Sequence, residues 1–102
     1  MPVCPPDRCE TMRDVRAGVD ALDRELVSLL ARRFAYMRAA ARIKPAREAV
    51  RDEARKAAVI AAAHEEARRL GAPAERVAAL WDALVESSIA YELEEWDRRR
   101  RT

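Results

Sequence analysis

The fold is decided by residues 11–43, which read TMRDVRAGVDALDRELVSLLARRFAYMRAAARI. The stretch contains no proline and one glycine, and Thr11 with Asp14 suits the start of a helix. Six large apolar residues recur at steps of three and four and form what we call the apolar stripe: Met12, Val15, Val19, Leu22, Leu26 and Leu29. A helix of this length would be roughly 45 Å long, which is too long to pack usefully within one small domain. We therefore expect it to cross into a partner chain.

Proline and glycine mark where the other helices begin and end. Pro45 lacks an N–H and disfavours helix at the residue before it, so the first helix should end near Ile43. A second helix is expected over about residues 50–70, because Gly71 suits the position just past a helix end. A third is expected from about Pro73 to the C-terminal arginines. The sequence thus predicts an all-α fold of one long and two shorter helices.

These boundaries divide the chain into an irregular N-terminal arm (1–10), a helical domain (11–97) and a basic C-terminal tail (98–102). The arm carries Cys4 and Cys9, which we interpret as two reduced thiols, because no second cysteine pair or nearby histidine completes a zinc site. The tail is interpreted as a solvated run of charge, which is the usual behaviour of such blocks.

Charge and hydropathy narrow the functional classes. The net charge of +2, from 20 basic and 18 acidic residues, argues against a strong non-specific nucleic-acid binder. No apolar run is long enough to span a membrane, and residues 1–10 lack the apolar segment of a signal peptide. We therefore expect a cytoplasmic protein with neither nucleic-acid nor membrane partners.

Cations interrupt or flank the apolar stripe of the first helix. Arg33 takes the stripe position that follows Leu29, where an apolar residue is expected. Arg16 lies beside the stripe, and Lys44 follows at the end of the helix. A buried charge is costly unless it meets an opposite charge or strong hydrogen bonds, so these cations need partners.

The last helix carries the opposite charge in the same kind of place. Glu92 falls between the large apolar residues Ile89 and Trp96, one turn after Ser88. One interpretation is a structural salt bridge between Arg33 and Glu92, or side chains that reach the surface. The other is a pocket for a ligand with more than one acidic group, because Arg16, Arg33, Lys44 and Arg55 together outnumber Glu92.

The residues that are missing narrow the chemistry further. The sequence offers no Ser–His–Asp or Cys–His arrangement, and its single histidine, His64, lies midway along the second predicted helix. It has no glycine-rich phosphate loop and no cluster of metal ligands. We expect an enzyme of this kind to need no cofactor or metal, and to rely on positioning and electrostatic stabilisation.

Seven short motifs occur in a specific order along the chain. They are Val15-Arg16, Val19-Asp20-Ala21-Leu22-Asp23, Leu29-Leu30-Ala31-Arg32-Arg33, Lys44, Val50-Arg51-Asp52, Arg55 and Ser88-x-x-x-Glu92. In order, spacing and helix boundaries this set resembles the all-helical, type II chorismate mutases and their relative, isochorismate pyruvate-lyase. The resemblance covers about residues 11–97.

The resemblance implies an intertwined homodimer with two equivalent active sites for a small dicarboxylate substrate. Arg16 would reach into the partner's site and hold a substrate carboxylate, while Arg33 would hold another from its own chain. Lys44 would contact a carboxylate and the ether oxygen that gains negative charge as the C–O bond breaks. Glu92 takes the place of a family residue that donates to the same oxygen. The residues that would line the rest of the pocket are Asp52, Arg55 and Ser88.

Two positions depart from the family pattern. Many relatives carry glutamine at the place of Glu92, and a carboxylate cannot donate a hydrogen bond whereas a carboxylic acid can. We therefore expect Glu92 to act in its protonated form, so that activity falls as pH rises. Lys56 stands where many mutases carry a glutamate that binds the substrate hydroxyl, which leaves a modified chorismate open as the substrate.

Four functions compete on these grounds, and the mutase is favoured over the lyase. Similarity to the lyase is carried by Tyr36, Ala39-Ala40, Arg42 and Lys44. Similarity to the mutases is carried by Val50-Arg51-Asp52 and Ser88. From another class, a non-catalytic helical dimer or regulatory module would pair Arg33 with Glu92 and leave no pocket. A nucleic-acid binder would depend on Arg98–Arg101, and deletion of that tail should leave a mutase's turnover largely intact.

Overall fold

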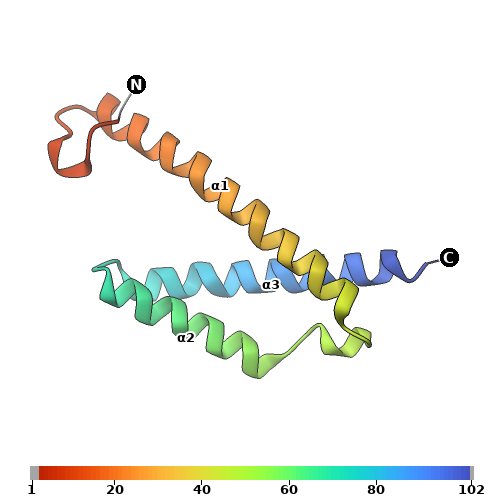
Figure 1. Cartoon of the computed structure of the whole chain (residues 1–102). Helices are drawn as coiled ribbons and strands as arrows, with labels where there is room; N and C mark the ends of the chain where they lie inside the picture. The colour runs from red at the N-terminus through yellow and green to blue at the C-terminus, as the bar shows by residue number, and fades with distance from the viewer. Residues whose placement is uncertain (1–2, 102) are drawn as a thin grey trace. The chain divides into compact units, whose positions relative to one another are not determined.

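A computed structural model describes residues 3–101, so the first two residues of the predicted arm and the last residue of the predicted tail lie outside it. The elements in order are η1 (Pro6–Arg8), α1 (Met12–Ile43), η2 (Arg47–Ala49), α2 (Glu53–Arg69) and α3 (Ala74–Arg99). Within the described range there is no strand, and the predicted all-α class with three helices is confirmed (Figure 1). The chain divides into two compact units, the first ending at Ala35 and the second starting at Tyr36.

The first unit contains the arm and most of α1, whose start is fixed by reciprocal capping. The Thr11 hydroxyl accepts a hydrogen bond from the Asp14 amide at 3.1 Å. In return, the Asp14 carboxylate accepts from the amides of Thr11 (3.3 Å) and Glu10 (3.1 Å). These bonds satisfy amides that the first turn of a helix leaves without intrahelical partners. The helix start predicted from Thr11 and Asp14 is confirmed.

The arm lies against the N-terminal part of α1. Arm and helix together enclose an apolar hollow of about 360 Å³, lined on the arm side by Val3, Cys4, Pro6 and Cys9. Both cysteines are free thiols. Burial, and then the neighbouring Cys4 and Asp14, raise the pKa of the Cys9 thiol, which disfavours its reactive thiolate.

The apolar stripe of α1 is largely uncovered. Five of its six residues are 49–59% exposed: Met12, Val19, Leu22, Leu26 and Leu29. Isolated apolar side chains at a surface are ordinary, but a continuous row of them along one helix face is typical of surfaces that interact with another molecule. The apolar stripe is thus an exposed apolar face of α1.

The second unit is held together by packing of α2 on α3. The two helices run antiparallel side by side, α2 in green and α3 in cyan to blue in Figure 1. The buried residues Val50, Val85 and Ile89 form the centre of the core. Val59, Leu93 and Trp96 pack around them and complete the core.

The turn between α2 and α3 follows from one glycine. Gly71 has a φ of 74°, a left-handed conformation that costs glycine little because it has no Cβ. Its amide donates to the Arg68 carbonyl at 3.2 Å, and the Ala72 amide donates to the Ala67 carbonyl at 2.8 Å. This pair of bonds is the Schellman arrangement that ends a helix. The role predicted for Gly71 is confirmed.

The start of α2 differs from its predicted position. The sequence placed it near Val50, whereas the helix begins at Glu53 with Asp52 as its N-cap. Residues Arg47–Ala49 form the separate 3-10 turn η2, and Val50 is buried in the core. Apolar periodicity alone could not separate a buried residue just before the helix from the first residue within it.

Candidate active site

Lys44 and Glu92 meet in the second unit. Lys44 directly follows the last residue of α1, and its ammonium lies 2.7 Å from Oε2 of Glu92 on α3. The Glu92 side chain is 5% exposed and that of Lys44 is 30% exposed, so the carboxylate is enclosed while the cation reaches the surface. Lys44 Nζ also donates to the Val50 carbonyl at 3.4 Å. The buried position predicted for Glu92 from its apolar neighbours is confirmed.

The pair is close in distance but poor in hydrogen-bonding geometry. Among the described residues, no hydrogen bond reaches the buried Oε2 of Glu92. The ammonium therefore supplies charge compensation without a well-directed bond. A buried carboxyl oxygen without a well-directed hydrogen bond calls for an explanation, such as a catalytic role or a bridging water or ion.

Ser88 lies one turn before Glu92 on α3 and is buried. Its hydroxyl donates to the Leu84 carbonyl at 2.7 Å, so the proton points back along its own helix. This is the local bond that serine often makes inside a helix. Ser88, Glu92 and Glu95 thus form a row of buried polar residues at steps of four and three along α3.

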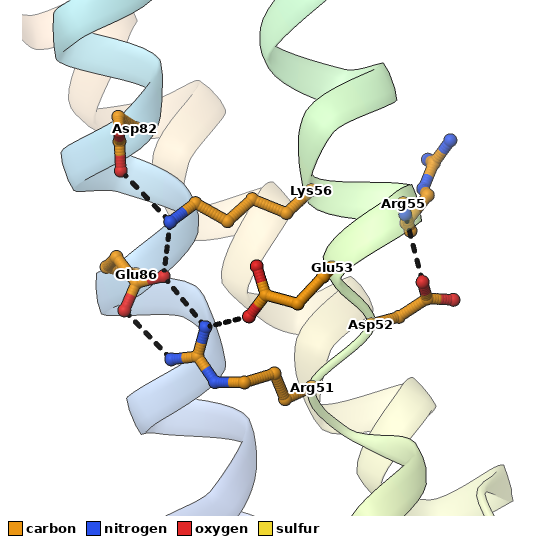
Figure 2. A network of polar contacts seen from close by, with 7 residues as sticks. All are labelled: Arg51, Asp52, Glu53, Arg55, Lys56, Asp82 and Glu86. Atoms are coloured by element: carbon orange, nitrogen blue, oxygen red, sulfur yellow. Dashed lines mark hydrogen bonds and ion pairs between the residues drawn. The ribbon is translucent and has the colours of Figure 1, made fainter.

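Asp52 and Arg55 stand at the start of α2. The Asp52 carboxylate accepts a hydrogen bond from the Arg55 amide at 2.9 Å and thereby caps the helix. The Arg55 side chain is exposed and points away from α3 (Figure 2). In this structure the two residues contact each other, and the contact is an N-cap.

A network of ions joins α2 to α3 beside this cap (Figure 2). Lys56 reaches across to Asp82 (3.2 Å) and Glu86 (2.8 Å). Arg51 binds both oxygens of Glu86, at 2.8 and 3.1 Å, and also contacts Glu53 at 2.9 Å. We call these five residues the α2–α3 ion network. Lys56, which departs from the family pattern, is therefore engaged by carboxylates of its own chain.

The ion network shifts the titration of its members. Hydrogen bonds from Arg51, and then from Lys56, lower the pKa of Glu86 to about 2. The bond to Glu86 in turn raises the pKa of Lys56. The side chains of Arg51, Lys56 and Glu86 are all partly open to solvent. The network is therefore a surface contact between α2 and α3, and salt can screen the attraction between its charges.

Arg16 and Arg33 belong to the first unit, along α1. Arg16 is exposed and Arg33 is half-buried. Along a helix their separation corresponds to about 26 Å, since each residue adds about 1.5 Å. One chain therefore cannot bring its own Arg16 and Arg33 to the same small ligand.

Several polar contacts of α3 were not predicted from the sequence. Arg38 donates to the Tyr91 hydroxyl at 3.0 Å, and that hydroxyl donates to Glu95 at 3.0 Å. Arg98 pairs with Glu95, and the bonded Arg98 lowers the pKa of this nearly buried carboxyl. The spacing of Glu95 from Glu92 could have indicated a second inward carboxylate, but nothing local pointed to Arg38.

The C-terminal arginines also depart from a purely solvated tail. The helix α3 extends through Arg99, and the Arg100 guanidinium donates to the carbonyls of Ala41 and Lys44, both at 2.8 Å. Trp96 Nε1 also donates to the Lys44 carbonyl, at 3.3 Å. The end of α1, where Lys44 sits, is thereby tied to the end of α3.

Within residues 3–101 no three histidine, cysteine, aspartate or glutamate side chains gather where they could hold a metal ion. His64 contacts Glu75 at 2.8 Å on the exposed side of the second unit. No helix of the described part is both long and apolar enough to cross a membrane.

Comparison with known proteins gives two matches. The family model for chorismate mutase type II matches residues 15–93, most of the chain. An isochorismate pyruvate lyase from Pseudomonas aeruginosa is 30% identical over 95 residues, which cover 93% of this chain and 94% of the relative. The matched range contains the Lys44–Glu92 pair, Ser88 and the α2–α3 ion network. The chain belongs to the type II chorismate mutase family.

Proposed function

We propose that the protein is a homodimeric, cytoplasmic chorismate mutase that converts chorismate to prephenate. The observation that carries the proposal is the ammonium of Lys44 held 2.7 Å from the buried, poorly bonded carboxyl of Glu92. Membership of a family of chorismate mutase-type enzymes supplies the reaction class. The pair offers a cation and a potential proton donor at one point, which suits an oxygen that gains negative charge.

The reaction requires the protein to position the substrate and to stabilise developing charge. Chorismate rearranges within one molecule, without a covalent enzyme intermediate, once a compact conformer brings its ends together. Catalysis then consists of holding that conformer and stabilising the ether oxygen as its bond to carbon breaks. Lys44 donates to this oxygen and to a carboxylate, and Glu92 donates to the same oxygen. No cofactor or metal takes part.

The donor role of Glu92 requires a proton. In the structure, the Lys44 ammonium compensates the buried carboxylate. A dianionic substrate that binds Lys44 competes for this compensation and brings more negative charge to Glu92. In its protonated form the Glu92 carboxylic acid can donate to the ether oxygen, whereas a carboxylate can only accept.

The proposed dimer brings the remaining cations to the site. The exposed apolar stripe of α1 gives a second copy a continuous face to pack on. Because Arg16 and Arg33 are about 26 Å apart along one helix, they serve different sites. Arg33 holds a substrate carboxylate in its own chain's site, and Arg16 holds one in the partner's site. The proposed pocket is completed by Asp52, Arg55 and Ser88.

Subunit mixing tests this shared site. Arg16→Ala and Arg33→Ala chains are each inactive as homodimers, but a mixed dimer has one site with both arginines intact. Random exchange of equal amounts should restore about a quarter of wild-type activity, because half the dimers carry one good site each. If mixing restores nothing although exchange is verified by mass, both arginines of a site come from the same chain and the shared arrangement is wrong.

A single assay plate tests the reaction. Purified protein is incubated with chorismate or with isochorismate, and prephenate, salicylate and pyruvate are followed. Prephenate from chorismate is the expected result. Salicylate with pyruvate from isochorismate would make the chain a lyase like its Pseudomonas relative, and turnover of neither would point to a non-catalytic dimer or a modified substrate.

A further inference from the structure

The last turn of α1 lacks a hydrogen-bond donor that the helix would normally supply. The carbonyl of Ala41 would accept from the amide four residues on, but that residue is Pro45, which has no N–H. Ala41 is 0% exposed, so solvent does not reach it to compensate. Arg100 supplies the donor instead, through Nη1 at 2.8 Å. An unmade bond at such a buried carbonyl would be costly.

The same guanidinium also holds Lys44. Nη2 of Arg100 donates to the Lys44 carbonyl at 2.8 Å, and Trp96 Nε1 donates to the same oxygen at 3.3 Å. The guanidinium lies over the Trp96 ring, 4.1 Å from its centroid, which fixes its plane. Two carbonyls and one aromatic face therefore determine where Arg100 sits. A planar guanidinium can donate to two carbonyls at once while it stacks on an aromatic ring, and a lysine ammonium would not replace it fully.

We propose that Arg100, fixed by Trp96, is a positioning residue for Lys44. It holds the backbone of Lys44 beyond the helix end so that Nζ stays opposite Glu92, where the reacting oxygen is stabilised. The inference rests on the proposed function of Lys44. Arg100 and Trp96 both lie past residue 93, beyond the range matched by the family model, so the family match does not imply a role for either. A positioning role for Arg100 also revises the expectation that deletion of the basic tail leaves turnover intact.

Backbone placement matters here because Lys44 has little else to hold it. It lies past the last residue of α1, where helices fray, and its four-carbon side chain is flexible. Within residues 3–101, the contacts that orient Nζ are the Glu92 ion pair and a long bond to the Val50 carbonyl. A displacement of about 1 Å in a catalytic group can cost on the order of a hundredfold in rate.

The test compares Arg100→Ala, Arg100→Lys and the control Arg101→Ala, which removes an equal charge one residue on. We expect kcat for prephenate to fall on the order of ten- to a hundredfold in Arg100→Ala, with a smaller change in KM, because Lys44 acts mainly on the transition state. Arg100→Lys should recover part of the loss, and Arg101→Ala should match wild type. Unchanged kcat in Arg100→Ala, with only a lower Tm, would show a purely structural role.

A double-mutant cycle asks whether the effect passes through Lys44. In a Lys44→Met background, Arg100→Ala should cause no further loss of kcat, since the group it positions is gone. Additive losses would overturn the proposal.

Amide hydrogen exchange supplies a readout without turnover. The Lys44 amide donates to the Ala40 carbonyl at 2.9 Å, so its exchange reports the last turn of α1. Arg100→Ala should speed exchange there and leave the middle of α2 unchanged. Unchanged exchange at the Lys44 amide would overturn the positioning role of Arg100. Faster exchange in a protein that turns over no substrate would support that role and overturn only the proposed function.

Discussion

Two groups of ions in the second unit invite comparison, because they use the same residue types in opposite ways. In the α2–α3 ion network, both oxygens of Glu86 are bonded and its side chain is 42% exposed. In the Lys44–Glu92 pair, the carboxyl is 5% exposed and its Oε2 accepts no hydrogen bond within the described chain. In the ion network, both carboxylate oxygens of Glu86 are hydrogen-bonded and stay in contact with solvent, as expected for ions that join two helices. In the Lys44–Glu92 pair, one carboxyl oxygen has no well-directed hydrogen bond, which suits the proposed substrate site.

Lys44→Met should have the largest effect on turnover. We expect kcat for prephenate to fall by about 10²- to 10³-fold, because a donor aimed at developing charge is lost. The single variant should also be less stable, since it leaves Glu92 buried without its cation. Steady-state kinetics and thermal unfolding measure the two effects.

A double variant separates the effect on turnover from the effect on stability. Lys44→Met with Glu92→Leu removes both charges, so it should recover stability while remaining inactive. Near-normal turnover in either variant would mean that the pair, like the ion network, is only structural.

Glu92→Gln tests the role of the buried carboxyl through the pH dependence of activity. Amide and carboxylic acid can both donate, so the variant should remain active, but it cannot lose its donor by ionisation. Wild-type kcat/KM should fall as pH rises, and the profile of Glu92→Gln should be flat over the same range. A flat wild-type profile would count against the protonated donor.

Glu86→Gln should have the smallest effect on turnover and a visible one on acid stability. The fold lowers the pKa of Glu86 from 4.5 to about 2, so the native state favours the ionised form. That stabilisation is present above the unfolded pKa and is lost as pH falls from about 4.5 toward 2. Wild type should therefore lose its stability advantage over Glu86→Gln across this window, as measured by urea unfolding at several pH values.

A matched control accompanies this experiment. Glu94→Gln changes an exposed carboxylate on the same helix and should leave the acid dependence of wild type in place. A Glu86→Gln protein with the same acid profile as wild type would show that the network does not favour the ionised carboxylate.

Local rules predicted the helices well. The cap at Thr11, the stop at Pro45 and the turn at Gly71 each follow from the backbone chemistry of one or two residues. The burial of Glu92 could also be predicted, because its apolar neighbours on α3 fix which way it faces. These features depend on spacings within one helix or turn, which the sequence shows directly.

What escaped prediction depends on contacts between distant segments. Arg100 meets Ala41 across 59 positions of sequence, and Lys56 meets Glu86 across 30. Neither pairing has a local signature, because any arginine or lysine on the right face would look the same. The substrate-site roles of all seven residues come from family resemblance and stay predictions; the residues are Arg16, Arg33, Lys44, Asp52, Arg55, Ser88 and Glu92.

The uncovered stripe of α1 has a consequence for how the protein is made. In the proposed dimer a second copy covers this stripe, so a newly synthesised chain would expose its row of apolar side chains until it meets that copy. A low protein concentration would lengthen this interval, and unrelated apolar surfaces would compete with dimer assembly. The concentration of matching chains would then affect how much of the newly made protein reaches the proposed dimer.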